Sequence, residues 1–290
     1  MDRPTPQPPE PDSNRFNAAE KLPDVSAKER EAIEKQGRPS AALIHETIRA
    51  EGESELERTV SALLLSGFAA GLSMGFSLIV EGLLQARLPE APWRELISKL
   101  GYTSGFLIVV LGRQQLFTEN TLTPVLPLLH HRDAATLGRV LRLWALVLAA
   151  NIAATWAIAA VLAHTDVVPP EVKAAFAEIS RKSVGESFGG TVLKAIFAGW
   201  LIAMMVWLLP AAESMRPVVI IIITYLVALG GFAHVIAGSV DAFYLVETGE
   251  AGLRDYLWRF FLPTLTGNVI GGVTLVAVLN WGQVAPELEE

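Results

Sequence analysis

Long apolar stretches are the feature that most limits what this chain can fold into. The hydrocarbon core of a bilayer is about 30 Å thick, so a helical span needs about 20 mostly apolar residues. Backbone polar groups find no water there and must be satisfied within the helix. We therefore predict an all-α integral membrane fold with six transmembrane helices, at about residues 60–84, 97–129, 140–163, 191–209, 218–247 and 257–280.

Composition supports a membrane protein and argues against several other classes. Only 18% of the 290 residues are charged, against roughly 25% in an average soluble domain. The chain has no cysteine, which excludes disulfides and thiolate metal sites. The sequence lacks the basic stripe that is typical of nucleic-acid binding. It also lacks a nucleophile elbow, a zinc-protease motif and a Walker loop, so it carries no signature of an enzyme. We expect a lipid bilayer as the surroundings, and neither a metal, a cofactor nor enzymatic activity.

Two of the six stretches are too long and too polar in the middle to be simple helices. The second contains "GRQQLFTEN" (112–120), and the fifth contains "GGFAHVIAGSVD" (230–241). Non-helical backbone at membrane depth is tolerated only where protein covers it or where it lines a cavity. We therefore predict that the second and fifth helices are broken and that the breaks form a pore or transport site around His234.

The two breaks also suggest an internal repeat. Thr118 precedes Asn151 by 33 residues, and His234 precedes Asn268 by 34. This spacing predicts two halves of three spans each, and because three is odd, the second half is inverted in the membrane. We expect Asn151 and Asn268 to contact the broken spans. Small residues that allow close helix packing are predicted at Gly67, Gly71, Gly75, Gly267 and Gly271.

The ends of the chain differ from this membrane domain. Residues 1–58 are rich in proline and charge, so we expect a cytosolic tail that is disordered at first and then helical. The membrane domain is expected at 59–281 and a short C-terminal tail at 282–290. Counting lysine and arginine in the loops does not decide the orientation.

Four motifs resemble the signature regions of the formate/nitrite transporter family, the anion channels of bacterial inner membranes. They are "LFTEN" (116–120), "GWLIAMMVW" (199–207), "GFAHVIAGS" (231–239) and "LPTLTGNVIGG" (262–272), and residues 45–58 resemble the YfdC-type branch. The resemblance covers about residues 55–280. It implies a homopentamer with an aquaporin-like topology, located in the inner membrane with both termini cytoplasmic.

The resemblance also implies roles for single residues. His234 matches the central pore histidine, and Thr118 matches the threonine of the first break. Constriction residues are then expected at Leu116, Phe117 and Phe232.

This chain departs from the family pattern in two places. Gly199 stands where members have an asparagine, and the first break contains Arg113, Gln115 and Glu119. We expect Arg113 and Glu119 to form a salt bridge that holds the loop. Lys182, with Arg181 beside it, is a candidate for attracting anions.

These features predict transport of a small monovalent anion or its neutral acid, together with protons. Burying a bare ion costs about 20 kcal/mol, whereas protonating a carboxylate of pKa about 4 at pH 7 costs about 4 kcal/mol. A histidine with an ordinary pKa of about 6.5 suits such a task. The expected function is thus a channel or proton-linked secondary transporter of formate or nitrite type.

Two alternatives remain open at this stage. The altered first break and Gly199 are compatible with a neutral small-solute channel of the water or glycerol type. The long acidic tail is compatible with a non-conducting membrane scaffold that binds a cytosolic partner.

Overall fold

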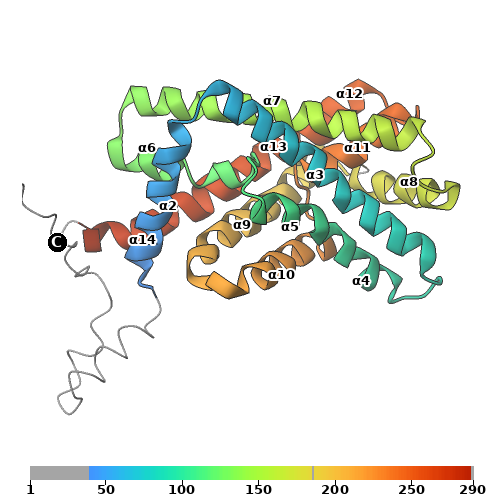
Figure 1. Ribbon diagram of the computed structural model, residues 1–290, viewed down its shortest axis with the longest axis horizontal. Coiled ribbons are helices and arrows are strands. Elements are labelled where there is room, and N and C mark those ends of the chain that lie inside the picture. Colours follow the sequence, from blue (N-terminus) through green and yellow to red (C-terminus); the bar gives the residue numbers. More distant parts are fainter. Residues whose placement is uncertain (1–38, 185, 289–290) are drawn as a thin grey trace, which may run out of the picture.

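The computed structural model describes residues 39–184 and 186–288, and within these residues all regular secondary structure is helical (Figure 1). The all-α prediction is therefore confirmed for the described part of the chain. The start of the N-terminal tail, which we predicted to be disordered, lies outside the described residues.

Four helical runs are long and apolar enough to cross a membrane. Two are single helices, α3 (Val60–Arg87) and α7 (Ala134–His164). The third joins α9 (Phe188–Ala212) to α10 (Arg216–Leu229) through the short turn η3 (Glu213–Met215). The fourth contains α12 (Leu253–Asp255), η4 (Tyr256–Phe261), α13 (Leu262–Val269), η5 (Ile270–Val278) and most of α14 (Leu279–Leu288).

Non-helical backbone interrupts the chain at both predicted places. Helix α5 (Thr103–Leu111) is followed by residues 112–118, which we call the first break, and then by η2 (Glu119–Thr121) and α6 (Val125–His131). Helix α10 is followed by residues 230–236, the second break, and then by α11 (Ala237–Glu247). Each apolar stretch is thus divided into two shorter helices.

Glycine brings two pairs of helices into backbone contact. A Cβ atom on Gly71 of α3 would lie 2.5 Å from the carbonyl oxygen of Asn151 in α7. A Cβ atom on Gly199 of α9 would lie 2.3 Å from the carbonyl oxygen of Asn268 in α13. A Cβ atom on Gly271 would lie 2.2 Å from the carbonyl oxygen of Ile196. Only glycine allows such approaches, so the prediction of close packing is confirmed, and Gly199 has a packing reason to be small.

The remaining elements gather at two opposite ends (Figure 1). One end, which we call the α2 side, holds α2 (Ala41–Leu56), α6 and α14; the other, the α8 side, holds α4 (Arg94–Ser98), η1 (Lys99–Tyr102) and α8 (Pro170–Val184). Helix α2 begins at Ser40, whose Oγ accepts a hydrogen bond from Leu43 N at 3.1 Å. Helix α14 continues through residue 282, where we expected a separate tail to start.

Candidate functional site

The two breaks are built from the same backbone hydrogen bonds. At the end of α5, Gln114 N donates to Val109 O at 3.0 Å, and at the end of α10, Phe232 N donates to Val227 O at 3.0 Å. In each break the preceding residue has a left-handed backbone, with φ of 51° at Arg113 and 57° at Gly231. All these pairs are separated by 118 residues, as in 231 minus 113. The two breaks are therefore one structural unit that occurs twice.

A buried asparagine holds each break in place. Asn151 Oδ1 accepts from Phe117 N at 2.9 Å, and its Nδ2 donates to Gln115 O at 3.0 Å and to Gly67 O at 2.7 Å. In the second break Asn268 Oδ1 accepts from Val235 N at 2.8 Å. Its Nδ2 donates to two carbonyl oxygens, those of Ala233 at 2.9 Å and Ala195 at 2.8 Å. Each side chain thus satisfies two backbone groups of its break, which a helix would otherwise satisfy, and ties them to a carbonyl of the neighbouring helix, α3 or α9.

These bonds correct the repeat register that we predicted from spacing. Phe117 corresponds to Val235, so the residue that corresponds to His234 is Leu116. Our count had paired Thr118 with His234, which is wrong by two residues. Thr118 and His234 are conspicuous polar residues in an apolar sequence, but the backbone hydrogen bonds to Asn151 and Asn268 set the register of the repeat.

Thr118 and His234 nevertheless meet, because the two breaks lie against each other. Thr118 Oγ1 is 2.7 Å from His234 Nε2, and both side chains are almost fully buried, at 0% and 1% exposure. His234 Nδ1 accepts hydrogen bonds from the backbone amides of Ile236 at 3.3 Å and Ala237 at 3.1 Å. Because Nδ1 is an acceptor, the proton of the neutral ring is on Nε2, which donates to Thr118. We call this contact the waist.

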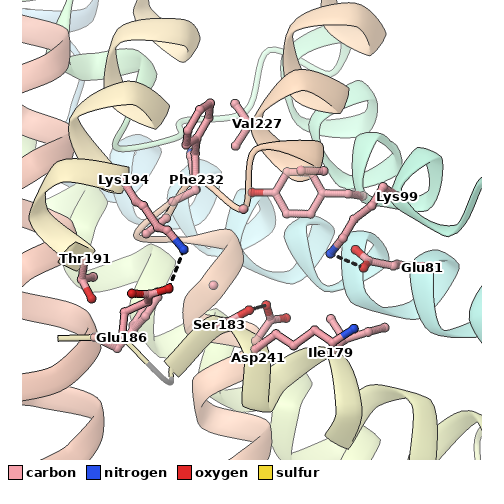
Figure 2. Close-up of a pocket in the computed structure, with 18 residues that line it drawn as sticks. Glu81, Lys99, Ile179, Ser183, Glu186, Thr191, Lys194, Val227, Phe232 and Asp241 are labelled. Carbon is pink, nitrogen blue, oxygen red and sulfur yellow. Dashed lines mark hydrogen bonds and ion pairs between the residues drawn. The ribbon is translucent and has the colours of Figure 1, made fainter. Parts of the chain in front are cut away.

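A small cavity reaches the waist from the α8 side. It has a volume of about 100 Å³, and we call it the α8-side vestibule. Phe232 lines it and stacks on Phe197 with ring centroids 5.2 Å apart. Figure 2 shows three polar pairs on its wall, which are Glu81 with Lys99, Glu186 with Lys194, and Asp241 with Ser183. His234 lines the same cavity.

A larger cavity of about 640 Å³, the α2-side vestibule, lies next to the first break. Glu55 of α2 accepts hydrogen bonds from Gln115 Nε2 at 3.1 Å and from Thr123 Oγ1 at 2.8 Å. Burial raises the pKa of the Glu55 carboxyl, although these two bonds oppose the shift. Helix α2 therefore contacts the first break directly through this carboxyl group.

The predicted constriction residues have different surroundings. Phe232 lines the α8-side vestibule, whereas neither Leu116 nor Phe117 lines either vestibule. Both are buried, and the Phe117 ring packs edge-on against Trp144 at 5.8 Å between centroids.

The predicted salt bridge between Arg113 and Glu119 is wrong. The Arg113 guanidinium forms an ion pair with Glu51 of α2 instead. Glu119 lines the α2-side vestibule, and its Oε1 is buried without a hydrogen-bond partner among the described residues. Arg113 therefore links the first break to α2, and the Glu119 carboxyl has no ion-pair partner among the described residues.

The two candidate anion-attracting residues are both in ion pairs. Lys182 lines the α8-side vestibule, and its Nζ lies 2.5 Å from Glu95 Oε1, a bond that raises its pKa. Arg181 pairs with Glu250 at 2.6 Å and does not line the vestibule. Of these two residues, Lys182 is therefore the one placed to act on a solute there.

Sequence reasoning did not identify most of the vestibule walls. Asp241 is the fifth residue of α11 and bonds to Ser183. The seven-residue spacing from His234 was the available signal. Glu55 and Lys99 gave no signal, because α2 and η1 reach the pore only through tertiary packing. The described residues contain no group of three side chains suited to a metal.

The fold and the waist define a class of membrane protein in which two interrupted helices meet around a polar contact between two vestibules. The family model described as formate/nitrite transporter matches residues 42–282. The chain therefore belongs to the formate/nitrite transporter family, a family of channels and transporters.

Two relatives support this membership, and a solved structure shares the fold. The chain is 43% identical over 257 residues to the inner membrane protein YfdC of Escherichia coli strain K12, covering 88% of this chain and 83% of that protein. It is 29% identical to the formate channel BtFdhC of Bacillus thuringiensis, covering 80% and 91%. A pentameric formate channel with formate bound superposes with a TM-score of 0.67 at 18% identity, covering 78% of this chain and 98% of that structure.

Proposed function

We propose that this chain is a channel or proton-linked transporter for small monovalent anions of the formate or nitrite type. The family assignment supports this, and so do the names of a relative that is a formate channel and of a structural neighbour with formate bound. The solute crosses the waist as its neutral acid.

The observation that carries the proposal is the hydrogen bond between Thr118 and His234, 2.7 Å long and buried between the two vestibules. An anion at this point would be surrounded by apolar protein, and a bare ion there costs about 20 kcal/mol. Adding a proton to a carboxylate of pKa about 4 at pH 7 costs only about 4 kcal/mol. The neutral acid therefore has the lower barrier.

The waist offers hydrogen-bond donors to that acid. His234 donates through Nε2–H, because its Nδ1 already accepts two backbone amides. The Thr118 hydroxyl accepts from the ring, and its own proton is then free to donate to a solute oxygen. In this scheme His234 stays neutral and orients the acid, while the proton travels on the solute. Leu116, Phe117 and Phe232 narrow the path, and Lys182 attracts the anion to the vestibule.

The fold supports a particular topology for this function. The first half comprises α3, the pair interrupted by the first break, and α7; the second comprises α9, the pair interrupted by the second break, and the run from α12 to α14. The matching bonds of Asn151 and Asn268 support an inverted repeat of six spans. We propose a homopentamer in the bacterial inner membrane, with a cytosolic tail (1–58), a membrane domain (59–281) and both termini cytoplasmic. The α2-side vestibule then faces the cytoplasm.

Reconstitution into liposomes tests the proposal. Wild-type protein should carry formate or nitrite, and His234→Phe should reduce the flux by about tenfold or more, because a buried polar group left without its hydrogen-bond partner costs about 1–3 kcal/mol. His130→Phe is the matched control, since this histidine is exposed at the end of α6. Unchanged flux in His234→Phe would disprove the role of the waist.

The same liposomes separate the two alternatives. Liposomes that contain a neutral-solute channel would shrink and swell rapidly in glycerol, whereas liposomes that contain a scaffold would show no flux of any kind. Neither alternative is favoured by the family assignment.

A further inference from the structure

Three carboxylate side chains line the α8-side vestibule together with His234. Two of them have a lysine partner: Glu81 Oε1 is 2.6 Å from Lys99 Nζ, and Glu186 Oε1 is 2.6 Å from Lys194 Nζ. The third, Asp241, accepts a hydrogen bond from Ser183 Oγ at 2.8 Å (Figure 2). Among the described residues, no lysine or arginine lies within ion-pair distance of Asp241.

Asp241 is close to the transport path and shielded from bulk water. Its side chain is 8% exposed, and it lines the same cavity of about 100 Å³ as His234. Gly238, one turn earlier on α11, lines the cavity as well, because residues three apart lie on the same helix face. A Cβ atom on Gly238 would lie 2.5 Å from the Phe260 ring, so glycine makes room there for Phe260, which lines the cavity as well.

The other groups around Asp241 are accounted for. The titratable and charged residues that share its cavity are Glu81 from α3, Lys99 and Tyr102 from η1, Lys182 from α8, Lys194 from α9, Glu186 and His234. Helices α7 and η4 also pack against α11 but place no charged side chain in the cavity, and Tyr256 of η4 bonds to Ser239. A proton leaving Glu81 or Glu186 changes an ion pair, whereas Asp241 gains and loses a proton without breaking one.

We infer that Asp241 is the proton donor for the anion that enters the α8-side vestibule. The inference rests on the proposed function and adds the residue that performs the protonation. The Asp241 carboxyl gives its proton to an oxygen of the solute anion, which becomes the neutral acid, and Asp241 remains as a carboxylate. It regains a proton from water in the vestibule. The acid passes the waist and releases its proton to water on the far side, so one proton moves with each anion.

His234 is a poorer donor for this step. A protonated ring would need a hydrogen on Nδ1, which would have to give up its bonds from the amides of Ile236 and Ala237. Losing them would leave the first turn of α11 without its acceptor. Orientation by His234 and protonation by Asp241 are therefore separate tasks.

The test is formate uptake into liposomes from external solutions between pH 5 and 8, with Asp241→Asn, Asp241→Glu and Asp166→Asn. Asp166 is a fully exposed aspartate near α8 that does not line the cavity, so it is the matched control. In Asp241→Asn the acid must come ready-made from bulk water, so its flux should rise about tenfold per unit of acidification and fall at least tenfold below wild type at pH 7. Wild type and Asp166→Asn should depend less steeply on pH, and Asp241→Glu should restore that shallower profile.

Each other outcome has a defined meaning. A wild-type profile in Asp241→Asn overturns the inference, and so does an equal loss at every pH, which would indicate a structural role alone. Size-exclusion chromatography of the purified variants identifies any loss of folding. If Asp241→Asn does not fold, a steep pH dependence of formate flux in Asp241→Glu would overturn the inference. If wild-type protein carries no weak acid at any pH, the proposed function fails first, and Asp241 is not the cause.

Discussion

The first and second breaks bend the chain with the same backbone hydrogen bonds, but they present different side chains to the pore. Val109 and Val227 accept corresponding bonds, and Asn151 and Asn268 hold corresponding residues. At the central position, however, the first break has Leu116 and the second has His234. The shared backbone makes two interruptions at membrane depth, and the unequal side chains give the pore its chemistry and its two distinct vestibules.

The largest effect is expected when either of the asparagines that hold the breaks, Asn151 or Asn268, is replaced. Asn151→Ala or Asn268→Ala leaves one backbone N–H and one carbonyl of the break without their bonds, and removes the bond to α3 or α9. Each unsatisfied buried group costs about 1–3 kcal/mol, so both variants should lose the folded protein or its flux to a similar extent. Fluorescence-detected size exclusion after heating measures this.

Asn280→Ala is the control for the asparagine variants. Asn280 has a single weak contact, 3.9 Å from Met204 Sδ, so its removal should have little effect. If only one of the two central asparagines proved essential, the equivalence of the breaks would be broken.

A smaller effect is expected at the left-handed position of each break. Gly231 has a φ of 57°, and a Cβ there would meet no other atom within 4 Å, so Gly231→Ala tests backbone strain alone. The left-handed conformation costs an L-residue about 1–2 kcal/mol, and the variant should melt at a lower temperature. Arg113→Gly should remove the same strain from the first break.

The two substitutions should therefore change the melting temperature in opposite directions. Arg113→Gly also loses the exposed ion pair with Glu51, which is worth about 0–1 kcal/mol, so its gain is the smaller of the two effects. Equal destabilisation by both would mean that the breaks do not share a conformational requirement.

The smallest effect concerns α2, which contacts the first break through Glu55. Burial raises the pKa of Glu55, so docked α2 retains a proton that free α2 would release. Docking is then strongest below the ordinary carboxyl pKa and weakens as the pH rises through the raised value. Glu55→Gln should remove this pH dependence.

Spin-label distances can follow that docking. The chain contains no cysteine, so labels can be confined to two introduced cysteines at exposed positions, Ala50→Cys on α2 and Leu137→Cys on α7. The distance distribution should broaden from pH 5 to pH 8 in otherwise wild-type protein and should stay narrow with Glu55→Gln. A distribution that does not change with pH would exclude Glu55 as the controlling group.

Much of this arrangement could be predicted because it is local in the sequence. Glycines and polar residues inside apolar stretches predicted both breaks, and glycines four residues apart predicted close helix packing, which the structure shows between α3 and α7. The asparagines were expected to contact the breaks because a polar side chain at that depth needs a partner.

What could not be predicted depends on long-range packing. The partner of Arg113 is Glu51, which lies 62 residues earlier on a helix whose docking leaves no local pattern. Asp241 and Ser183 meet across 58 residues, from α11 and α8. The register error of two residues had a different cause, since we aligned the chemically unusual side chains and the backbone bonds follow the asparagines instead.

The central claim is that a neutral acid crosses the waist between Thr118 and His234. Simultaneous measurement of labelled formate uptake and of charge movement in liposomes tests it most directly. The account predicts uptake with one proton for each formate, stimulation by external acidification and no net current. A steady formate current that does not change with pH would contradict it.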